Sequence, residues 1–191
     1  MEVASAADLN NRPRATCQYL GRVEGDGGLI TDIERTAHHE AGHVVFGYRW
    51  LKELPVYAEV RSTEIGQGGC DWADLAAPLV NYKSVTPEDR KRLELLVGML
   101  TAGDAAAETL TQRSLPELWT RDQAMARLFV SRYLPGVTET LDLEIGRQRR
   151  VAMEFFAQPA PWAQVELVAR ALLKAPNRRL ERRELLVLLT E

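Results

Sequence analysis

The apolar residues divide the chain into a stretch without periodicity, a short alternating segment and a long series of helical segments. Residues 1 to about 30 are rich in Asn, Gly, Asp and Arg and show no period, which predicts a flexible or arm-like N-terminal segment. Residues 31–191 are long enough to bury a core of their own and are expected to form one domain.

The clearest helix begins at Thr31. Thr31 and Glu34 have the spacing of a capping box, in which each side chain bonds the free backbone amide of the other residue. Apolar residues then recur at helical spacing as far as Leu51, and Pro55 ends the helix. The same criteria predict further helices over residues 87–111, 121–133, 138–156, 162–174 and 181–189.

Residues 56–71 change to a period of about two. Val56, Ala58 and Val60 alternate with more polar neighbours, and the glycine-rich segment 66–69 supplies a turn. This alternation is typical of a β-hairpin. With the helices around it, the hairpin predicts a mainly α domain with a small antiparallel β-sheet.

The composition is that of an ordinary soluble globular protein, with 46% hydrophobic and 27% charged residues. The net charge of −3 argues against binding to nucleic acid or to an anionic membrane, because both need concentrated positive charge. The basic cluster 147–150 has acidic neighbours and is expected to be a solvated helix face. No apolar stretch is long enough to cross a bilayer, and two widely spaced cysteines are typical of a cytoplasmic protein.

The chemistry concentrates in the first predicted helix, where residues 39–43 read HEAGH and contain the motif His-Glu-x-x-His. Residues four apart lie on one helix face, so the imidazoles of His39 and His43 can bind the same ion. Zn²⁺ is the expected cofactor, because it lowers the pKa of its bound water to about 7 and polarises a carbonyl. Glu40 would take the proton of that water as general base. His38 has only a glycine four residues later and is not expected to be a ligand.

A catalytic zinc ion needs a third protein ligand and an open position. All three histidines of the chain lie in this helix, so the candidates are carboxylates or, less suitably, the two thiols. One carboxylate region contains Asp104 and Glu108, in a stretch of small residues where another helix can approach closely. The other is Asp122, in the first turn of a predicted helix, where it could equally serve the helix dipole. The residue pattern leaves this choice open.

The motif and its surroundings resemble the FtsH family of ATP-dependent zinc metallopeptidases, which carry the stretch His-Glu-Ala-Gly-His-Ala. Weaker similarities extend over about residues 31–189. Segment 54–70 resembles the family's edge strand and glycine turn, 103–108 its Gly-Arg-Ala-Ala-Glu-Glu segment, 120–127 its Asn-Asp stretch, and 165–189 its last two helices. The resemblance implies an FtsH-type metallopeptidase domain.

The resemblance also implies roles for two carboxylates. Asp122 aligns with the family's third zinc ligand, and Glu108 becomes a buried carboxylate that orients a metal-bound imidazole. Cys70 stands where the family usually has tyrosine, and Arg121 where it has asparagine. Family members also carry a membrane anchor and an ATPase module, which this sequence does not contain. We therefore expect a peptidase for unfolded or flexible polypeptides, acting alone or with a separate ATPase, and as a monomer or a homo-oligomer.

The predicted strand beside the metal helix suggests how substrate binds. If residues 56–61 form an exposed edge strand, a peptide can add to it as a further strand through main-chain hydrogen bonds. The residues assigned to this substrate site are Val56, Val60 and Gly69. The alternative is a strand that is fully paired within the domain.

The sequence thus predicts a zinc-dependent endopeptidase. One alternative is a non-catalytic zinc-binding or interaction module derived from such a peptidase, although a purely structural zinc site does not require Glu40. A second is a regulatory peptidase of the ImmA/IrrE type, which shares His-Glu-x-x-His. The companion DNA-binding module of that type is not evident, and the Ala-Gly pair inside the motif favours the FtsH family.

Overall fold

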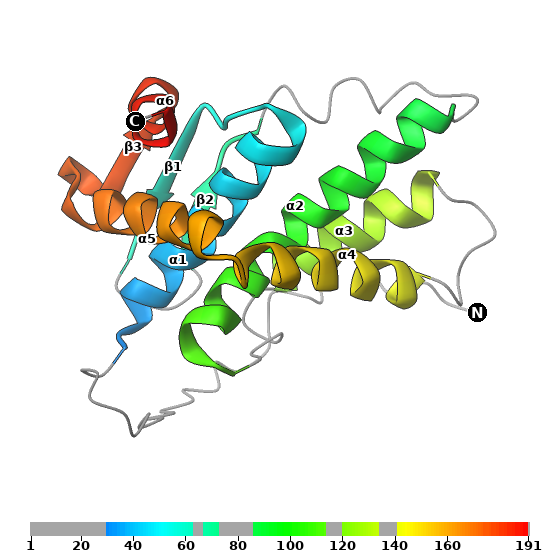
Figure 1. Ribbon diagram of the computed structural model, residues 1–191, viewed down its shortest axis with the longest axis horizontal. Helices are drawn as coiled ribbons and strands as arrows, with labels where there is room; N and C mark the ends of the chain where they lie inside the picture. The colour runs from blue at the N-terminus through cyan, green and yellow to red at the C-terminus, as the bar shows by residue number, and fades with distance from the viewer. Residues whose placement is uncertain (1–29, 63–66, 73–85, 114–119, 134–140, 191) are drawn as a thin grey trace, which may run out of the picture.

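The computed structural model describes residues 30–62, 67–72, 86–113, 120–133 and 141–190 (Figure 1). The predicted N-terminal arm lies outside these ranges except for its last residue. Within them the chain is mainly helical with one small antiparallel sheet, which confirms the coarse fold class. The elements are α1 (Asp32–Phe46), the π-helical turn η2 (Gly47–Leu51), β1 (Tyr57–Val60), β2 (Gly68–Cys70), α2 (Pro87–Thr111), α3 (Thr120–Tyr133), α4 (Leu141–Phe156), α5 (Pro159–Lys174), the 3₁₀ turn η5 (Pro176–Arg178), β3 (Arg179–Glu181) and α6 (Arg182–Thr190).

Side-chain caps fix where α1 and α2 begin. The Glu34 backbone N–H donates to the Thr31 hydroxyl at 3.3 Å, and the Thr31 N–H donates to the Glu34 carboxylate at 2.8 Å, which confirms the capping box. Thr86 and Asp89 form an equivalent box before α2. These caps satisfy amide groups that have no partner within the helix, so α1 starts about two turns before the metal motif.

Helix boundaries differ from the prediction in several places. The first helix was predicted to run to Leu51, but α1 ends at Phe46 and the chain continues as the π-helical turn η2. Helix α5 begins at Pro159 and not at 162, because the first turn of a helix tolerates prolines, whose missing N–H groups need no partner there. The helix predicted from 181 begins at Arg182, because residues 179–181 form a strand instead. That strand, β3, was not predicted, since three residues are too few to show a period.

The sheet has the order β2-β1-β3, with both pairs antiparallel. Ala58 lies opposite Cys70 on one side and opposite Leu180 on the other. The predicted hairpin is therefore present, but Gly68 and Gly69 belong to its second strand and not to the turn.

The central position of β1 decides between the two alternatives for residues 56–61. Residues 56–61 are not an exposed edge strand, because β2 and β3 occupy both sides of β1. Even Val56, just before the strand, donates its N–H to Asp71 and accepts at its carbonyl from Arg182. The alternative of a fully paired strand is confirmed. Within the described residues, the free edge nearest the metal helix belongs to β2, since Gly68 lies against Glu40.

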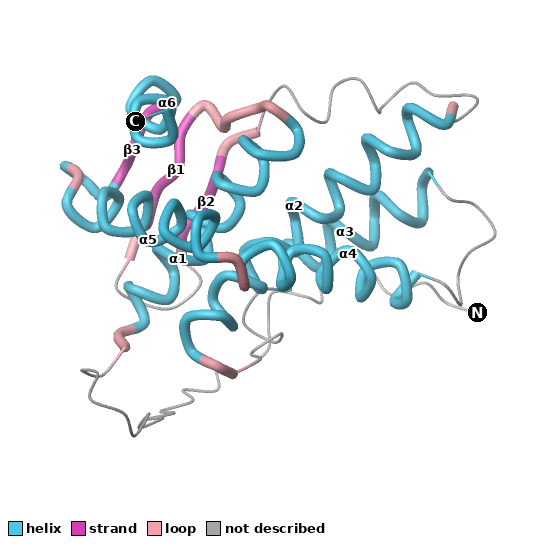
Figure 2. Tube along the Cα trace, in the orientation of Figure 1, coloured by secondary structure: helices cyan, strands magenta, loops and turns pink. Residues whose placement is uncertain are grey.

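Helix α1 occupies the centre of the fold. It lies between the sheet, α5 and α6 on one side and α2, α3 and α4 on the other (Figure 2). Helix α2 crosses α1 so closely that a Cβ on Gly42 would lie 2.6 Å from the Ala102 carbonyl oxygen and 2.7 Å from the Ala106 Cβ. The small residues thus allow the close helix approach expected from the sequence, and this approach brings α2 under the metal motif.

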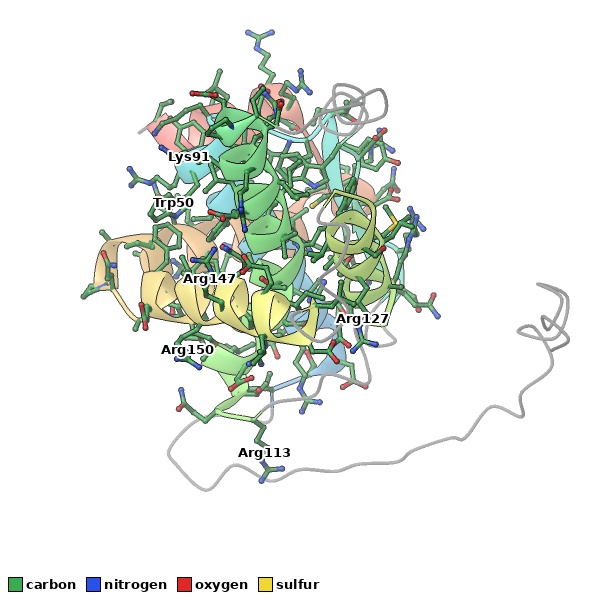
Figure 3. The ribbon with its side chains drawn as sticks, turned by 90° about the vertical axis from the view of Figure 1, so that its right-hand side faces the viewer. Trp50, Lys91, Arg113, Arg127, Arg147 and Arg150 are labelled. Carbon is green, nitrogen blue, oxygen red and sulfur yellow. The ribbon has the colours of Figure 1, made fainter. Side chains whose placement is uncertain are left out.

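The surface of α3 and α4 is solvated and carries mixed charge. Figure 3 shows Arg127, Arg147 and Arg150 on these helices, and all three are exposed. Arg147 pairs with Glu94 and Glu144, so the basic cluster is balanced by acidic neighbours as predicted. None of the helices in the described ranges combines the length and the hydropathy required to span a bilayer.

Candidate metal centre

The two histidines of the motif converge as their spacing predicts. Both imidazoles are buried, and their Nε2 atoms lie 3.0 Å apart on one face of α1. The rings meet edge to face, with an interplanar angle of 86°. Two nitrogens are thus directed at one point inside the fold.

Asp122 supplies a third ligand atom from α3. Its Oδ2 lies 2.9 Å from His39 Nε2 and 3.3 Å from His43 Nε2, although His39 and Asp122 are 83 residues apart. In tetrahedral zinc coordination with bonds of about 2.0–2.1 Å, neighbouring ligand atoms lie about 3.3–3.4 Å apart. The observed triangle of atoms is close to this size. His39, His43 and Asp122 could therefore hold a metal ion and leave a fourth position open.

The backbone sets the tautomer of His43. Its Nδ1 lies 2.7 Å from the carbonyl oxygen of Met99, which can only accept a hydrogen bond. Nδ1 must therefore carry the proton, and the neutral ring presents the lone pair of Nε2 to the ligand triangle. A main-chain carbonyl of α2 thus prepares an imidazole of α1 for metal binding.

Gly103 makes room for the imidazoles. A Cβ at this position would lie 2.5 Å from His39 Cε1 and 2.5 Å from His43 Nε2. Any side chain would push one ring aside, so glycine is required by this close approach. The fit of both rings over α2 supports the use of this triangle as a metal site.

The charges of the site depend on one another. Burial lowers the pKa of His39 to about 4. Burial also acts to lower the pKa of His43, but the carboxylates of Asp122 and Glu40 outweigh it and raise that pKa to about 9. The two imidazoles hold the pKa of Asp122 well below its usual range despite its burial. Without metal, the proton at neutral pH therefore sits on His43.

This proton predicts a pH dependence of metal binding. Because His43 is protonated below about pH 9 in the metal-free protein, an ion entering this site must displace one proton, and the affinity for Zn²⁺, used as the probe ion, should rise roughly tenfold per pH unit between about pH 6 and 8. Titration against a chromophoric chelator at each pH measures this slope. An affinity that stays constant over the same interval would contradict the proposed proton balance.

Glu40 lies next to the ligand triangle and is held by β2. It is 5% exposed, and burial raises its pKa to about 7. The Cys70 thiol donates to Glu40 Oε2 at 3.3 Å. A Cβ on Gly68 would lie 2.4 Å from Glu40 Oε1, so the strand presses directly on the carboxylate. Helix and strand together confine this group beside the metal site.

Glu108 is not the carboxylate that orients an imidazole, contrary to the prediction. It forms an ion pair with Arg149 of α4. Asp104, one helical turn earlier, lies beside His39 instead, with Oδ1 3.9 Å from His39 Nδ1. Burial raises the pKa of Asp104 to about 7. The sequence contained this signal, since Asp104 was a candidate ligand in the same small-residue stretch.

The three residues predicted to bind substrate do not form one exposed surface. Val60 is 1% exposed and belongs to the core, because it sits on the inner face of the central strand. Val56 precedes that strand and is engaged on both sides. Only Gly69 lies on the edge strand, where the Arg61 guanidinium approaches its outer face. Gly68 and the Met99 carbonyl were not foreseen, because their roles depend on contacts and not on side-chain chemistry.

Neither the protein-family models nor the curated proteins compared with this chain include a match. The geometry of the metal centre is therefore the basis on which a function can be assigned.

Proposed function

We propose that this protein is a zinc-dependent endopeptidase of the FtsH type, which cleaves unfolded or flexible polypeptides. The observation that carries the proposal is a buried glutamate held between the ligand triangle and the edge strand β2. A structural zinc site has no use for an acid in this position, whereas a hydrolase needs a base there.

Each residue of the site has a separate role in the proposed hydrolysis. When bound, zinc lowers the pKa of its water to about 7 and polarises the scissile carbonyl. His39, His43 and Asp122 would hold the ion, and the Met99 carbonyl keeps the proton of His43 on Nδ1, so that the lone pair of Nε2 is free for the ion. Glu40 accepts the proton of the attacking water at its carboxylate and can return it to the leaving amine. In the metal-free protein burial raises the pKa of Glu40 to about 7, so the buried site favours proton uptake by this carboxylate.

The edge of β2 is the proposed place for the substrate backbone. Arg61 and Asp71 donate their N–H groups to Gln67 and Tyr57, so the ladder bonds join every second residue of β2 to β1. Gly68 and Cys70 therefore direct their main-chain groups away from β1, and both also touch Glu40. A peptide added along this edge would pass beside the general base.

This mode of binding selects conformation more than sequence. Main-chain pairing requires an extended, unpaired segment, which folded proteins rarely offer. We therefore expect broad sequence preference and cleavage within flexible segments. Two further expectations stay predictions. One is that a separate ATPase unfolds the substrates, and the other is that the protein forms a homo-oligomer.

The proposal is tested by metal removal and restoration. The purified protein should degrade dye-labelled casein, lose this activity on treatment with a chelator and regain it with about one equivalent of Zn²⁺. A compact folded protein of similar size serves as control and should resist cleavage. If the protein binds zinc tightly but cleaves neither casein nor flexible peptides, it is a zinc-binding module and the peptidase proposal fails.

A further inference from the structure

We infer that Asp104 is a positioning residue of the metal centre, linking the ligand on α1 to the helix that carries the ligand on α3. The inference rests on the proposed metal site and adds a residue that neither the motif nor the resemblance identifies. It concerns the arrangement of the ligands, and it can be tested without any peptidase assay.

Asp104 contacts both sides of the site. Its carboxylate is 5% exposed and projects from α2, the helix packed under the two imidazoles. Oδ1 lies 3.9 Å from His39 Nδ1. Oδ2 accepts a hydrogen bond from Gln123 Nε2 at 3.3 Å, and Gln123 directly follows Asp122 in α3. One buried group thus touches a ligand of α1 and the neighbour of the ligand of α3.

The position of Oδ1 suits a metal-bound imidazole. Among the described residues no hydrogen-bond donor reaches this oxygen, although it is buried and faces the ring nitrogen of His39 that is turned away from the triangle. When Nε2 binds a cation, the proton of the ring must sit on Nδ1, and a nearby carboxylate stabilises that tautomer. The backbone of Gly103 also bonds His39, but it is uncharged. The charge of Asp104 therefore adds an electrostatic stabilisation of the Nδ1-protonated ring of His39.

Glu108 cannot take this part in the observed arrangement. Its carboxylate is engaged by Arg149 of α4, and it lies one turn further along α2. The two acids thus make a matched pair on the same helix. One faces the site, and the other stabilises the contact with a neighbouring helix.

The test compares Asp104→Asn with Glu108→Gln. Asparagine keeps the shape and can still pair with Gln123, but it removes the carboxylate from His39. We expect zinc affinity, measured by competition with a chromophoric chelator, to fall about 10- to 100-fold in Asp104→Asn and to stay unchanged in Glu108→Gln. The metal-free Asp104→Asn protein should unfold at the same temperature as wild type, whereas the gain in that temperature on adding zinc should shrink.

Further measurements separate positioning from a general structural role. The visible absorption of the Co²⁺-loaded protein should change in Asp104→Asn and not in Glu108→Gln, because only the former disturbs the ligand geometry. If Asp104→Asn does not fold, Gln123→Ala provides the second test, with a smaller loss of zinc affinity in the same direction.

Three outcomes would overturn the assignment. The first is a zinc affinity of Asp104→Asn that stays within about threefold of wild type, because losing a group that orients a metal ligand usually costs more than that. The second is a loss of affinity in Glu108→Gln instead. The third is a wild-type protein that binds no zinc, which removes the metal centre as well. A wild type that binds zinc without cleaving peptides defeats the proposed function alone and leaves this test intact.

Discussion

Glu40→Gln is expected to reduce peptidase turnover by about 10²- to 10⁴-fold while the protein still takes up one equivalent of zinc. The glutamine amide has the size of the carboxylate and fits between Gly68 and Cys70, but it cannot accept the proton of the attacking water. The lost step is proton transfer, so kcat should fall more than KM rises. Peptide hydrolysis and metal analysis of the same preparation measure both quantities.

Glu154→Gln is the matched control, because Glu154 is exposed on α4 and remote from the motif in sequence. It should leave both turnover and zinc content at wild-type values. A Glu40→Gln protein that retains more than about a tenth of wild-type turnover would show that another group serves as base.

Asp122→Ala is expected to weaken zinc binding by at least about 100-fold, more than the loss of a group outside the ligand triangle would. The substitution leaves only two imidazoles for the ion and removes the one ligand that carries a full negative charge. It also removes the carboxylate that raises the pKa of His43, so that pKa should fall from about 9. Chelator competition measures the affinity, and NMR titration of the metal-free protein follows the histidine.

Asp142→Ala provides the control for this change. Asp142 also lies in the first turn of a helix, but it pairs with the exposed Arg127 and should not affect zinc. If Asp122→Ala binds zinc as tightly as wild type, the ligand triangle is wrong. Asp104 and Glu108 would then be the next carboxylates to test.

Short-range sequence patterns were sufficient to predict the local structure and the convergence of the two imidazoles of the candidate metal site. The capping box at Thr31 and the four-residue spacing of His39 and His43 act within two turns of one helix, and the structure contains both as predicted. Helical periodicity also placed the other helices to within a few residues. These features depend on hydrogen bonds and side-chain directions that neighbouring residues determine.

The third ligand could not be identified from such short-range patterns. Residue types left Asp104, Glu108 and Asp122 as candidates, and only the resemblance to a known family singled out Asp122. The same resemblance pointed to Glu108 beside an imidazole, yet that acid pairs with Arg149 and Asp104 lies at the ring. One helical turn separates the two acids, and only the packing of α2 against its neighbours decides which of them faces the site.

The sheet shows the same division. Alternation predicted a strand at β1, but whether that strand lay at the edge depended on β3, which joins it from more than a hundred residues away. The sequence by itself determined the caps, the helices and two convergent imidazoles, because each is set within a few residues along the chain. The tertiary structure decided that Asp122 lies beside the two imidazoles, that β1 is not an edge strand, and that Asp104 lies beside His39. These results depend on the close crossing of α1 and α2 at Gly42 and Gly103, on the packing of α3 against α2, and on the strand order.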